Sequence, residues 1–329
     1  ALAWKENGYD ISVLTLAPSY PLGRIFKGYK NYFFRSDKYQ GINIYRIFSV
    51  TGYKSSVFKK ILRYFIFAFL GSFVAICIGK KYDYIFGYNM SSLTNMIPAV
   101  IIRKLFNKPL MFWVQDIWPD SVYAYGLKKT KIFSGVLHRF VKFIYSNVDT
   151  FAISGKGFKV KIAPYSKKNV TFHYSPNWAD ELDESLTKEN LGGSKQTTHF
   201  TFAGNVGKVQ NLENIINGFK LLSKNYQKKA QLNIIGDGSN LNNIKLIANK
   251  NSNIIFHGKK LRSKIFGYYK SSDFLIISLI KKPIFSYTVP AKTQTYIAAK
   301  KPILAIINGE TAKIIKDNNS IQVVSGYTE

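Results

Sequence analysis

Short apolar runs alternate with helix-length segments over residues 199–325, and glycine turns interrupt this alternation twice. One turn is Gly204-Asn205-Val206-Gly207 and the other is Gly236-Asp237-Gly238. Strands separated by helix-length segments predict a parallel sheet that is covered on both faces. Glycine turns at the carboxyl ends of such strands bind phosphates, because free backbone N–H groups and the positive end of the next helix point at the ligand. The region therefore predicts one half of a nucleotide-handling enzyme.

Both halves of the chain show this α/β alternation. In the second half, the predicted strands are residues 200–203, 232–235, 253–256, 273–280, 302–307 and 321–324. After the first glycine turn, a helical spacing joins Leu212, Ile215, Ile216, Phe219, Leu221 and Leu222. In the first half, the predicted strands are residues 11–16, 42–47, 84–87, 110–114, 150–153 and 170–173, and a helical pattern covers 131–145. Two similar α/β units are therefore expected.

A polar and acidic stretch separates the two units. Residues 179–195 follow Pro176-Asn177-Trp178 and contain Gly192-Gly193, which predicts an interdomain connection. We therefore predict an N-terminal domain over residues 1–178 and a C-terminal domain over residues 196–329. With 329 residues, of which 46% are hydrophobic, the chain is long enough to bury two cores.

The two ends of the sequence lead to a further expectation. The chain begins with Ala1-Leu2-Ala3-Trp4, without a methionine, in a pattern typical of the end of a helix. We expect a first strand and most of a first helix to precede it. Beyond the strand at 321–324, a doubly wound domain would continue into C-terminal helices. The sequence is thus expected to be a piece of a longer protein, so the absence of a signal peptide carries no conclusion.

The charge balance predicts an anionic partner. The 47 Lys and Arg residues against 18 Asp and Glu give a formal net charge of +29, and the field of such a surface attracts sugar nucleotides, acidic lipids or nucleic acid. The lone Cys77 excludes an internal disulfide. The four histidines are scattered and no zinc or haem spacing occurs, so that neither a metal nor a cofactor is expected.

One uncharged, apolar segment could contact a membrane. It begins at Tyr64 and ends at Gly79, with Lys59, Lys60 and Arg63 before it and Lys80 and Lys81 after it. It is shorter than the roughly 20 residues that span a bilayer, which makes a transmembrane helix the third choice. Its all-round apolarity favours a buried helix, whereas its basic flanks favour an interfacial helix on anionic headgroups. Both of these interpretations stay open.

Several motifs carry a resemblance to a known family. In order, they are Gln115-Asp116-Ile117-Trp118-Pro119-Asp120, Pro176-Asn177-Trp178, Gly204-Asn205-Val206-Gly207-Lys208-Val209-Gln210, Ile234-Ile235-Gly236-Asp237-Gly238, and Pro290-Ala291-Lys292 with Tyr296-Ile297-Ala298-Ala299-Lys300-Lys301-Pro302. Together they resemble family 4 glycosyltransferases, and within them the capsule and O-antigen enzymes that are similar to N-acetyl-L-fucosamine transferases. The resemblance covers almost the whole chain.

The resemblance implies a fold and an activity. The fold would be GT-B, an α/β architecture of two Rossmann-like, doubly wound domains that face each other across a cleft. The second domain would hold a sugar nucleotide and the first would hold the acceptor. The transfer would retain the configuration of the sugar and would need no metal.

Breaking a sugar–phosphate bond leaves negative charge on the diphosphate, and without a metal fixed donors and cations must stabilise it. Lys208, in the first glycine turn, and Lys292, at the start of a predicted helix after Pro290, are the candidate cations. The alternatives are a solvated loop lysine for Lys208 and an N-terminal surface lysine for Lys292. The helix dipole would disfavour the latter, so we predict that Lys292 acts in catalysis.

Other predicted donor-binding residues lie at strand ends. Gly204, Asn205 and Gly207 belong to the first turn, and Gly236, Asp237 and Gly238 to the second. We expect the second turn to shape the wall near the diphosphate, and the alternative, that Asp237 or Ser239 caps the next helix, to hold in part as well. His257-Gly258 ends another strand, where the resemblance implies the nucleotide base. A histidine at a strand end can equally be structural.

The chain departs from the family pattern at two glutamates. Many family 4 enzymes carry two glutamates eight positions apart, where this chain has Tyr287 and Thr295. Glu310, in Asn308-Gly309-Glu310, could contact donor hydroxyls in their place, or it could cap the following helix. Asn205 and Gln210 also stand where relatives often have Arg and Lys on the diphosphate, which leaves the identity of the donor open.

On the acceptor side, Asp116 follows the predicted strand 110–114 and is flanked by Trp113 and Trp118. A carboxylate there could orient the acceptor hydroxyl while the tryptophans stack on a sugar ring. Alternatively, Gln115 and Asp116 brace the loop and the tryptophans belong to the core. We predict Asp116 as a catalytic residue, with Trp113, Gln115 and Trp118 as acceptor-side contacts.

These observations predict a retaining glycosyltransferase. It would move a sugar, an acetamido-deoxyhexose, from a UDP-sugar to a lipid-diphosphate-linked acceptor in capsule or O-antigen synthesis. It would be cytoplasmic and peripheral on the inner face of the bacterial plasma membrane, held there by residues 64–79 and their basic flanks. The alternatives are a catalytically inert homologue that binds nucleotide or membrane, and a basic nucleic-acid-binding protein. No helix-turn-helix, zinc finger or RNP pattern supports the latter.

Overall fold

The computed structural model describes residues 1–53, 56–89, 92–124, 126–179, 182–222, 226, 229–249 and 251–318. The chain divides into two compact units. Unit 1 comprises Ala1–Tyr123, Lys128–Ile153 and Lys159–Ser175, and unit 2 comprises Ala124–Leu127, Ser154–Phe158 and Pro176–Glu329. Two short segments of the N-terminal half therefore pack with unit 2. The strand predicted at 321–324 lies outside the described residues.

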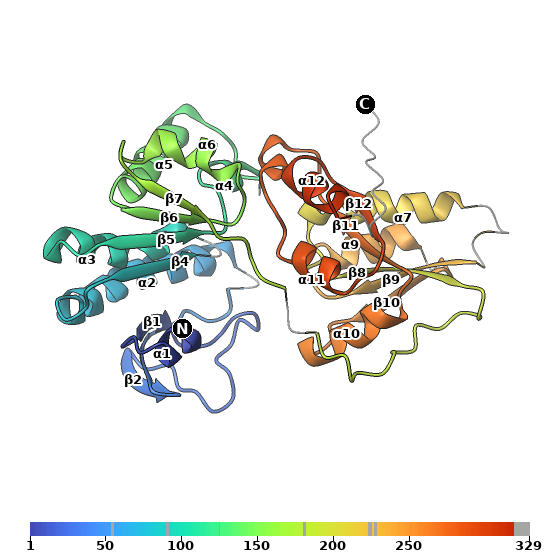
Figure 1. Cartoon of the computed structure of the whole chain (residues 1–329), viewed down its shortest axis with the longest axis horizontal. Helices are drawn as coiled ribbons and strands as arrows, with labels where there is room; N and C mark the ends of the chain where they lie inside the picture. Colours follow the sequence, from blue (N-terminus) through green and yellow to red (C-terminus); the bar gives the residue numbers. More distant parts are fainter. Residues whose placement is uncertain are drawn as a thin grey trace. The chain divides into compact units, whose positions relative to one another are not determined.

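Unit 1 contains two sheets (Figure 1). In the first, β1 (Ser12–Leu16) pairs in parallel with β3 (Ile42–Ile47), and β3 pairs antiparallel with β2 (Phe34–Tyr39). In the second, β4 (Ile85–Asn89), β5 (Leu110–Val114), β6 (Thr150–Ile153) and β7 (Thr171–Tyr174) are parallel and lie side by side in this order. The predicted bounds of β3, β5 and β6 are confirmed. Among the described residues, the predicted strands of this half are thus divided between two sheets.

Strand β2 was not among the strands predicted from the sequence periodicity. Its residues read FRSDKY, and most of them are exposed, so β2 has no apolar run. The pairing register places Arg35 opposite Arg46. Asp37 relieves this repulsion, because its carboxylate accepts hydrogen bonds from Arg35 Nε at 2.5 Å and Arg46 Nε at 3.0 Å. The two guanidinium groups hold the pKa of Asp37 below its usual range, although burial opposes the shift.

The helices of unit 1 include α1 (Leu2–Glu6), α2 (Val57–Gly79), η1 (Leu93–Met96), α3 (Ile97–Phe106), α4 (Asp120–Ala124), α5 (Lys131–Tyr145), α6 (Phe158–Ile162) and η2 (Ala163–Tyr165). One row of the four-stranded sheet runs through Gly87, Phe112 and Phe151, which are in register. Met96 packs over Gly87, where a Cβ would lie 2.2 Å from the Met96 methyl group. Tyr145 of α5 covers Phe112 and Phe151, with ring centroids at 6.1 and 5.5 Å. We call α2, α3 and α5 the helical layer of unit 1.

Small residues hold α2 against the rest of the unit. Its N-cap Ser56 accepts a hydrogen bond from Lys59 N. Its buried residues are Ala68, Gly71, Ala75 and Gly79. A Cβ on Gly79 would lie 2.8 Å from Ile102 of α3, and one on Gly71 would lie 3.1 Å from Pro98. Close helix packing thus requires these small side chains.

The opposite face of α2 is apolar and exposed. Phe65 and Phe69 are each 64% exposed and Phe73 is 57% exposed. Of the two interpretations that the sequence left open, a fully buried helix is therefore wrong. The helix extends N-terminally of the predicted segment to a length of 23 residues, and by length and composition alone it could cross a membrane. Its small-residue face is nevertheless packed on α3.

Unit 2 is built on a five-stranded parallel sheet with the order β10-β9-β8-β11-β12. Its strands are β8 (Thr198–Ala203), β9 (Ala230–Ile235), β10 (Ile254–Gly258), β11 (Phe274–Ser278) and β12 (Ile303–Ile306). The chain moves outward from β8 through β9 to β10, and β11 then lies on the other side of β8. The strand order therefore reverses between β8 and β11, and ligands of such sheets bind at this reversal.

Helices cover both faces of the sheet in unit 2. Helices α7 (Leu212–Leu221) and α9 (Leu241–Ala248) bury one apolar cluster with Phe202, Leu232 and Ile276. The predicted helical positions Leu212, Ile215, Ile216 and Phe219 lie in this cluster. Leu221 does not, because it is 87% exposed at the end of α7. The other helices are η3 (Lys208–Gln210), α10 (Arg262–Ser271), η4 (Pro283–Ser286), α11 (Lys292–Ala298) and α12 (Glu310–Lys316).

The predicted connection at 179–195 packs on unit 2 in its described part. Leu191 is buried and its carbonyl oxygen accepts a hydrogen bond from Gln231 Nε2 at 2.5 Å. Ser271 Oγ donates to the carbonyl oxygen of Glu189 at 2.6 Å. A Cβ on Gly267 would lie 2.7 Å from the carbonyl oxygen of Thr187. This stretch is thus hydrogen-bonded to α10 and β9.

Candidate functional site

The two glycine turns of unit 2 interlock at the carboxyl ends of β8 and β9. Gly204 N donates to the carbonyl oxygen of Ile235 and Val206 N donates to that of Asp237, both at 2.9 Å. Gly236 N donates to the carbonyl oxygen of Gly258 at 2.9 Å, which joins the end of β10 to the second turn. The structure therefore brings together three of the predicted donor-binding segments in one wall.

Glycine is required where these turns touch. Gly236 has a φ of +141°, and a Cβ on it would lie 1.9 Å from the carbonyl oxygen of Gly204. A Cβ on Gly238 would lie 2.3 Å from the carbonyl oxygen of Val206. Gly204 itself has a φ of +142°, and a Cβ there would lie 3.0 Å from Lys292 Nζ. Main chain and lysine thus approach more closely than any larger residue would permit.

Lys292 and Tyr296 of α11 both reach the end of β8. Lys292 Nζ donates to the carbonyl oxygen of Ala203 at 3.0 Å. The Tyr296 hydroxyl donates to the same oxygen at 3.2 Å and accepts from Ala203 N at 3.0 Å. Since α11 follows β11, these contacts lie where the strand order reverses. The sequence reasoning assigned no role to Tyr296, although it stands in the motif that begins at Pro290.

The Lys292 ammonium lies in an apolar setting. Lys292 as a residue is partly exposed, but its Nζ is enclosed and lies 3.8 Å from the centroid of the Phe202 ring. Burial lowers its pKa from 10.5 to about 7. An anion beside Nζ would favour the charged form. Lys292 is thus poised to gain charge when a phosphate approaches.

The remaining residues of the first turn are arranged around Gly207. Gln210 Oε1 accepts from Gly207 N at 3.0 Å, so Gln210, which stands where relatives often have a basic residue, closes the turn. A Cβ on Gly207 would also lie 3.1 Å from Asn205 Nδ2. Lys208 begins η3 and is exposed. The diphosphate role of Lys208 stays a prediction. Lys292, in contrast, lies against the turn.

Asp237 and His257 have local partners. Asp237 Oδ1 accepts from Gly238 N at 2.8 Å, and the side chain is exposed. Asp237 and Ser239 do not cap α9, whose N-cap is Asn240, so that alternative is wrong. His257 Nε2 lies 2.9 Å from Asn233 Oδ1, and burial lowers the pKa of His257. The nucleotide-base role at His257-Gly258 stays a prediction.

Glu310 binds a turn that the sequence reasoning missed. Its carboxylate accepts from Lys156 N at 2.6 Å and from Gly157 N at 3.0 Å. The N-cap of α12 is Gly309, without a side-chain bond, so the capping interpretation of Glu310 is wrong. A Cβ on Gly157 would lie 2.4 Å from Tyr287 Cδ1. Gly155 and Gly157, shortly after β6, are the sequence feature that could have predicted this turn.

Thr295, the other departure from the glutamate pattern, is buried within α11. Tyr287 follows η4 and packs on the turn at Gly157. A Cβ on Gly155 would also lie 2.6 Å from the carbonyl oxygen of Tyr287. The two positions therefore serve packing in this structure.

The acceptor-side candidates lie in unit 1, after β5. Burial raises the pKa of Asp116 to about 6. Trp113 Nε1 donates to the carbonyl oxygen of Ser175 at 3.0 Å, and its ring lies 5.2 Å from that of Tyr88. Trp118 N donates to the Tyr145 hydroxyl at 3.4 Å. Asp116 is therefore a partly buried residue in a loop braced by aromatic side chains.

Gln115 and Asp120 complete this loop. Gln115 is partly buried between β5 and Asp116. Asp120 begins α4, and its carboxylate lies 3.8 Å from Lys161 Nζ. In the part of the chain that the structure describes, no group of three or more His, Cys, Asp and Glu side chains could hold a metal ion.

Comparison with known proteins agrees with this arrangement. Residues 197–327 match the family model "Glycosyl transferases group 1". The chain is 28% identical over 243 residues to "Probable glycosyltransferase WbjE" of Pseudomonas aeruginosa, a match that covers 70% of this chain and 59% of that protein. The chain thus spans less than two thirds of the length of that relative.

Solved structures share the fold. WaaG, a glycosyltransferase involved in lipopolysaccharide biosynthesis, has a TM-score of 0.67 at 12% identity, over 100% of this chain and 81% of that chain. Anabaena Alr3699/HepE in complex with UDP-glucose has a TM-score of 0.55 at 11% identity, over 75% of this chain and 65% of that chain. The predicted α/β GT-B fold is therefore confirmed, and residues 197–327 are similar to group 1 glycosyltransferases.

Proposed function

We propose that the protein is a retaining glycosyltransferase that moves a sugar from a UDP-sugar to a lipid-diphosphate-linked acceptor in bacterial polysaccharide synthesis. The observation that carries this proposal is the wall at the reversal of the unit 2 sheet, where Gly204 and Gly236 interlock and Lys292 Nζ lies beside them. Such a wall suits a nucleoside diphosphate. The similarity to the probable glycosyltransferase WbjE supports sugar transfer, the similarity to WaaG supports polysaccharide synthesis, and the HepE complex with UDP-glucose supports the donor class.

The chemistry divides between the two units. Departure of the diphosphate from the sugar carbon concentrates negative charge on the leaving oxygen, and protonated Lys292 would stabilise it. Asp116 would accept a hydrogen bond from the acceptor hydroxyl and orient it for attack. With a pKa of about 6, Asp116 is largely ionised at neutral pH, as this role requires. We propose an acetamido-deoxyhexose as the transferred sugar.

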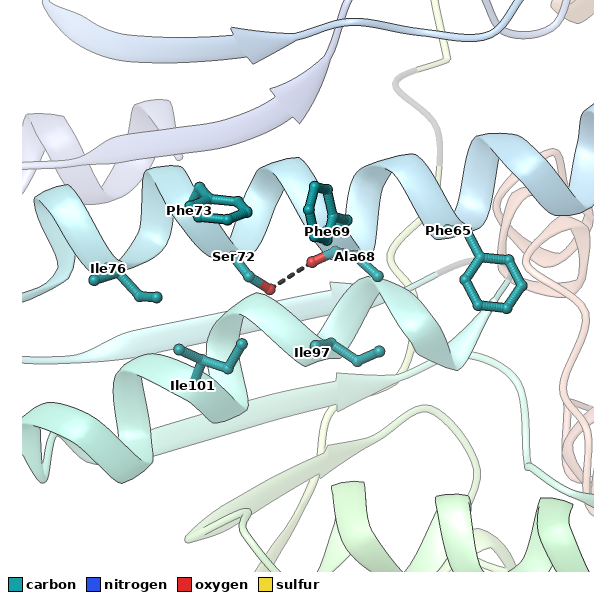
Figure 2. Close-up of a pocket in the computed structure, with 8 residues that line it drawn as sticks. All are labelled: Phe65, Ala68, Phe69, Ser72, Phe73, Ile76, Ile97 and Ile101. Atoms are coloured by element: carbon teal, nitrogen blue, oxygen red, sulfur yellow. Dashed lines mark hydrogen bonds between the residues drawn. The ribbon is translucent and has the colours of Figure 1, made fainter.

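A lipid-linked acceptor requires access to a membrane, and α2 supplies a suitable surface. Figure 2 shows Phe65, Phe69, Phe73 and Ile76 of α2 beside Ile97 and Ile101 of α3, where they line a groove of about 420 Å³. The Ser72 hydroxyl in this groove donates to the carbonyl oxygen of Ala68, so its polarity is satisfied within α2. We propose that α2 and its basic flanks hold the protein on the cytoplasmic face of the plasma membrane.

Calorimetric titration tests the donor class. UDP is expected to bind, and GDP, ADP and a short single-stranded DNA at moderate salt are expected to bind weakly. The matched control is Lys292→Met, which keeps the shape of the side chain but lacks the charge. Salt-sensitive binding led by DNA, without nucleotide selectivity, would replace the transferase by a basic nucleic-acid-binding protein.

The replacement of the two family glutamates by Tyr287 and Thr295 favours a second candidate, an inert homologue that binds nucleotide. An assay of UDP release from UDP-N-acetylhexosamines, with and without lipid-linked acceptor, distinguishes the two candidates. UDP release that depends on the acceptor supports the enzyme. Tight UDP binding without release under any donor and acceptor supports the inert homologue.

A further inference from the structure

The helical layer of unit 1 is free of acidic side chains. The sequences of α2, α3 and α5 are VFKKILRYFIFAFLGSFVAICIG, IPAVIIRKLF and KIFSGVLHRFVKFIY, and none of these described helices contains Asp or Glu. Soluble helices ordinarily carry carboxylates on their outer face, paired with cations of the same helix. The outer face of this layer therefore combines apolar side chains with positive charge that no carboxylate of the same helices balances.

Helix α5 has two apolar faces, of which one is buried. Its buried residues are Leu137, Val141, Ile144 and Tyr145, which pack toward the sheet. On the opposite side, Ile132 is 84% exposed and Val136 is 60% exposed. Arg139 and Phe143 continue this stripe at helical spacing, and Phe143 is 41% exposed. Exposing an apolar stripe of this kind to water is unfavourable, whereas the same stripe is stabilised at the interface of a bilayer.

Contacts between the helices make the exposed residues one continuous surface. Lys104 of α3 places its Nζ 5.1 Å from the centroid of the Phe143 ring of α5. The next residue, Leu105, is 58% exposed. On the other side, α3 packs on α2 through Ile102 and Gly79. The exposed residues of α3 therefore adjoin those of α5 on one side, and α3 packs on α2 on the other.

Two carboxylates at the margins of the layer, Asp149 and Asp83, have cationic partners. Asp149, which follows α5, accepts from Arg103 Nε at 2.8 Å and from Lys167 Nζ at 2.5 Å. These partners hold the pKa of Asp149 below its usual range against the effect of burial. Asp83, which follows α2, lies 3.8 Å from Lys108. The field outside the layer is thus set by its lysines and arginines.

We propose that α5 is a second membrane contact, so that unit 1 docks on an anionic bilayer with the whole helical layer and not with α2 alone. Ile132 and Val136 enter the headgroup boundary, and Arg139 and Lys142 bind lipid phosphates. The charge complementarity of an acid-free surface with anionic lipids selects this partner. The inference rests on the membrane association in the proposed function and extends it to a surface on another helix.

Sedimentation of the protein with vesicles of phosphatidylcholine and phosphatidylglycerol tests this inference. The double variant Ile132→Ser, Val136→Ser is expected to bind about tenfold more weakly than the unmodified protein. The charge-reversal variant Arg139→Glu, Lys142→Glu is expected to lose at least about tenfold and to show a weaker dependence on salt. Leu246→Ser, at a 78% exposed leucine of α9 in unit 2, is the matched control and should bind unchanged.

The outcomes separate this inference from the function on which it rests. If Phe65→Ser, Phe69→Ser, Phe73→Ser abolishes binding while both α5 variants bind like the unmodified protein, α2 alone docks and the inference is overturned. If the unmodified protein does not bind anionic vesicles, both the inference and the membrane part of the proposed function are wrong. UDP titration of each variant shows whether unit 2 is intact.

Discussion

Lys292 Nζ and the carbonyl oxygen of Ala203 lie 3.0 Å apart, and this contact joins the start of α11 to the end of β8. Because the Tyr296 hydroxyl also donates to the same oxygen, the carbonyl keeps a partner when the lysine leaves it or is replaced. Lys292 is therefore available to a ligand at little cost to the fold.

The pKa of about 7 at Lys292 predicts that UDP binding takes up a proton. Above pH 7 the free lysine is mostly neutral, and a diphosphate beside Nζ raises its pKa and charges it. UDP affinity is expected to fall between pH 7 and pH 9. Calorimetry at pH 8 in buffers of different ionisation enthalpy measures the proton uptake. Lys292→Met should bind UDP roughly 10- to 100-fold more weakly, with no uptake assigned to this residue.

Lys292 also predicts how stability depends on pH. Its folded pKa of about 7 lies below the unfolded value of 10.5, so the unfolded chain binds more protons between these two values. The contribution of Lys292 to the free energy of unfolding should therefore rise as the pH increases from 7 toward 10. Urea unfolding of the unmodified protein and of Lys292→Met compares the two slopes. Equal slopes would place Nζ in water and remove the basis of the proton uptake.

Asp116→Asn is expected to increase stability at neutral pH and to slow sugar transfer. The folded pKa of about 6 lies above the usual aspartate value of 3.8, so the stability contributed by protonated Asp116 is lost as the pH rises through 6. Relative to the unmodified protein, the variant should gain on the order of 2–3 kcal/mol between pH 4 and pH 8. Denaturation across this range measures the gain. UDP affinity should not change, because Asp116 belongs to unit 1; full transferase activity in the variant would contradict its catalytic role.

Gly236→Ala is expected to disrupt the interlocked turns. The new methyl group would lie 1.9 Å from the carbonyl oxygen of Gly204 at a φ of +141°, which should cost at least ~3 kcal/mol or prevent folding of unit 2. The matched control is Gly218→Ala within α7, where nothing lies within 4 Å of the added Cβ. That change should stabilise the helix by ~0.5–1 kcal/mol. Similar melting temperatures for the two variants would show that the turns do not touch.

Glu310→Gln is expected to destabilise the protein by ~1–3 kcal/mol, because an amide can offer only one oxygen to the two N–H groups of Lys156 and Gly157. Glu6→Gln, at an exposed position in α1, should change stability by less than ~0.5 kcal/mol. Thermal unfolding measures both effects. If Glu310→Gln were as stable as the unmodified protein but weakened UDP-sugar binding, the carboxylate would serve donor hydroxyls instead.

Local sequence determined the alternation of strands and helices and the places where turns had to be glycine. Strands β5 and β6 follow from short runs of apolar residues, because such runs suit a parallel sheet that is covered on both faces, and β3 follows from an alternation of isoleucines with polar residues and tyrosine. The glycines at 204, 236 and 238 signal turns because other residues disfavour those backbone angles or close approaches. These features depend on neighbours along the chain, so they can be read without the fold.

Tertiary structure decided what depends on residues distant in the sequence. Strand β2 is held by the ion pairs of Asp37 and by pairing with β3, which no apolar pattern announces. The partner of Glu310 lies about 150 residues earlier in the chain. The low pKa of Lys292 arises from enclosure beside Phe202. The small residues of α2 pack on α3, and the buried residues of α5 pack on the sheet. The remaining apolar side chains of each helix therefore point outward. Packing across the chain sets charge, exposure and partners, and composition alone does not contain that information.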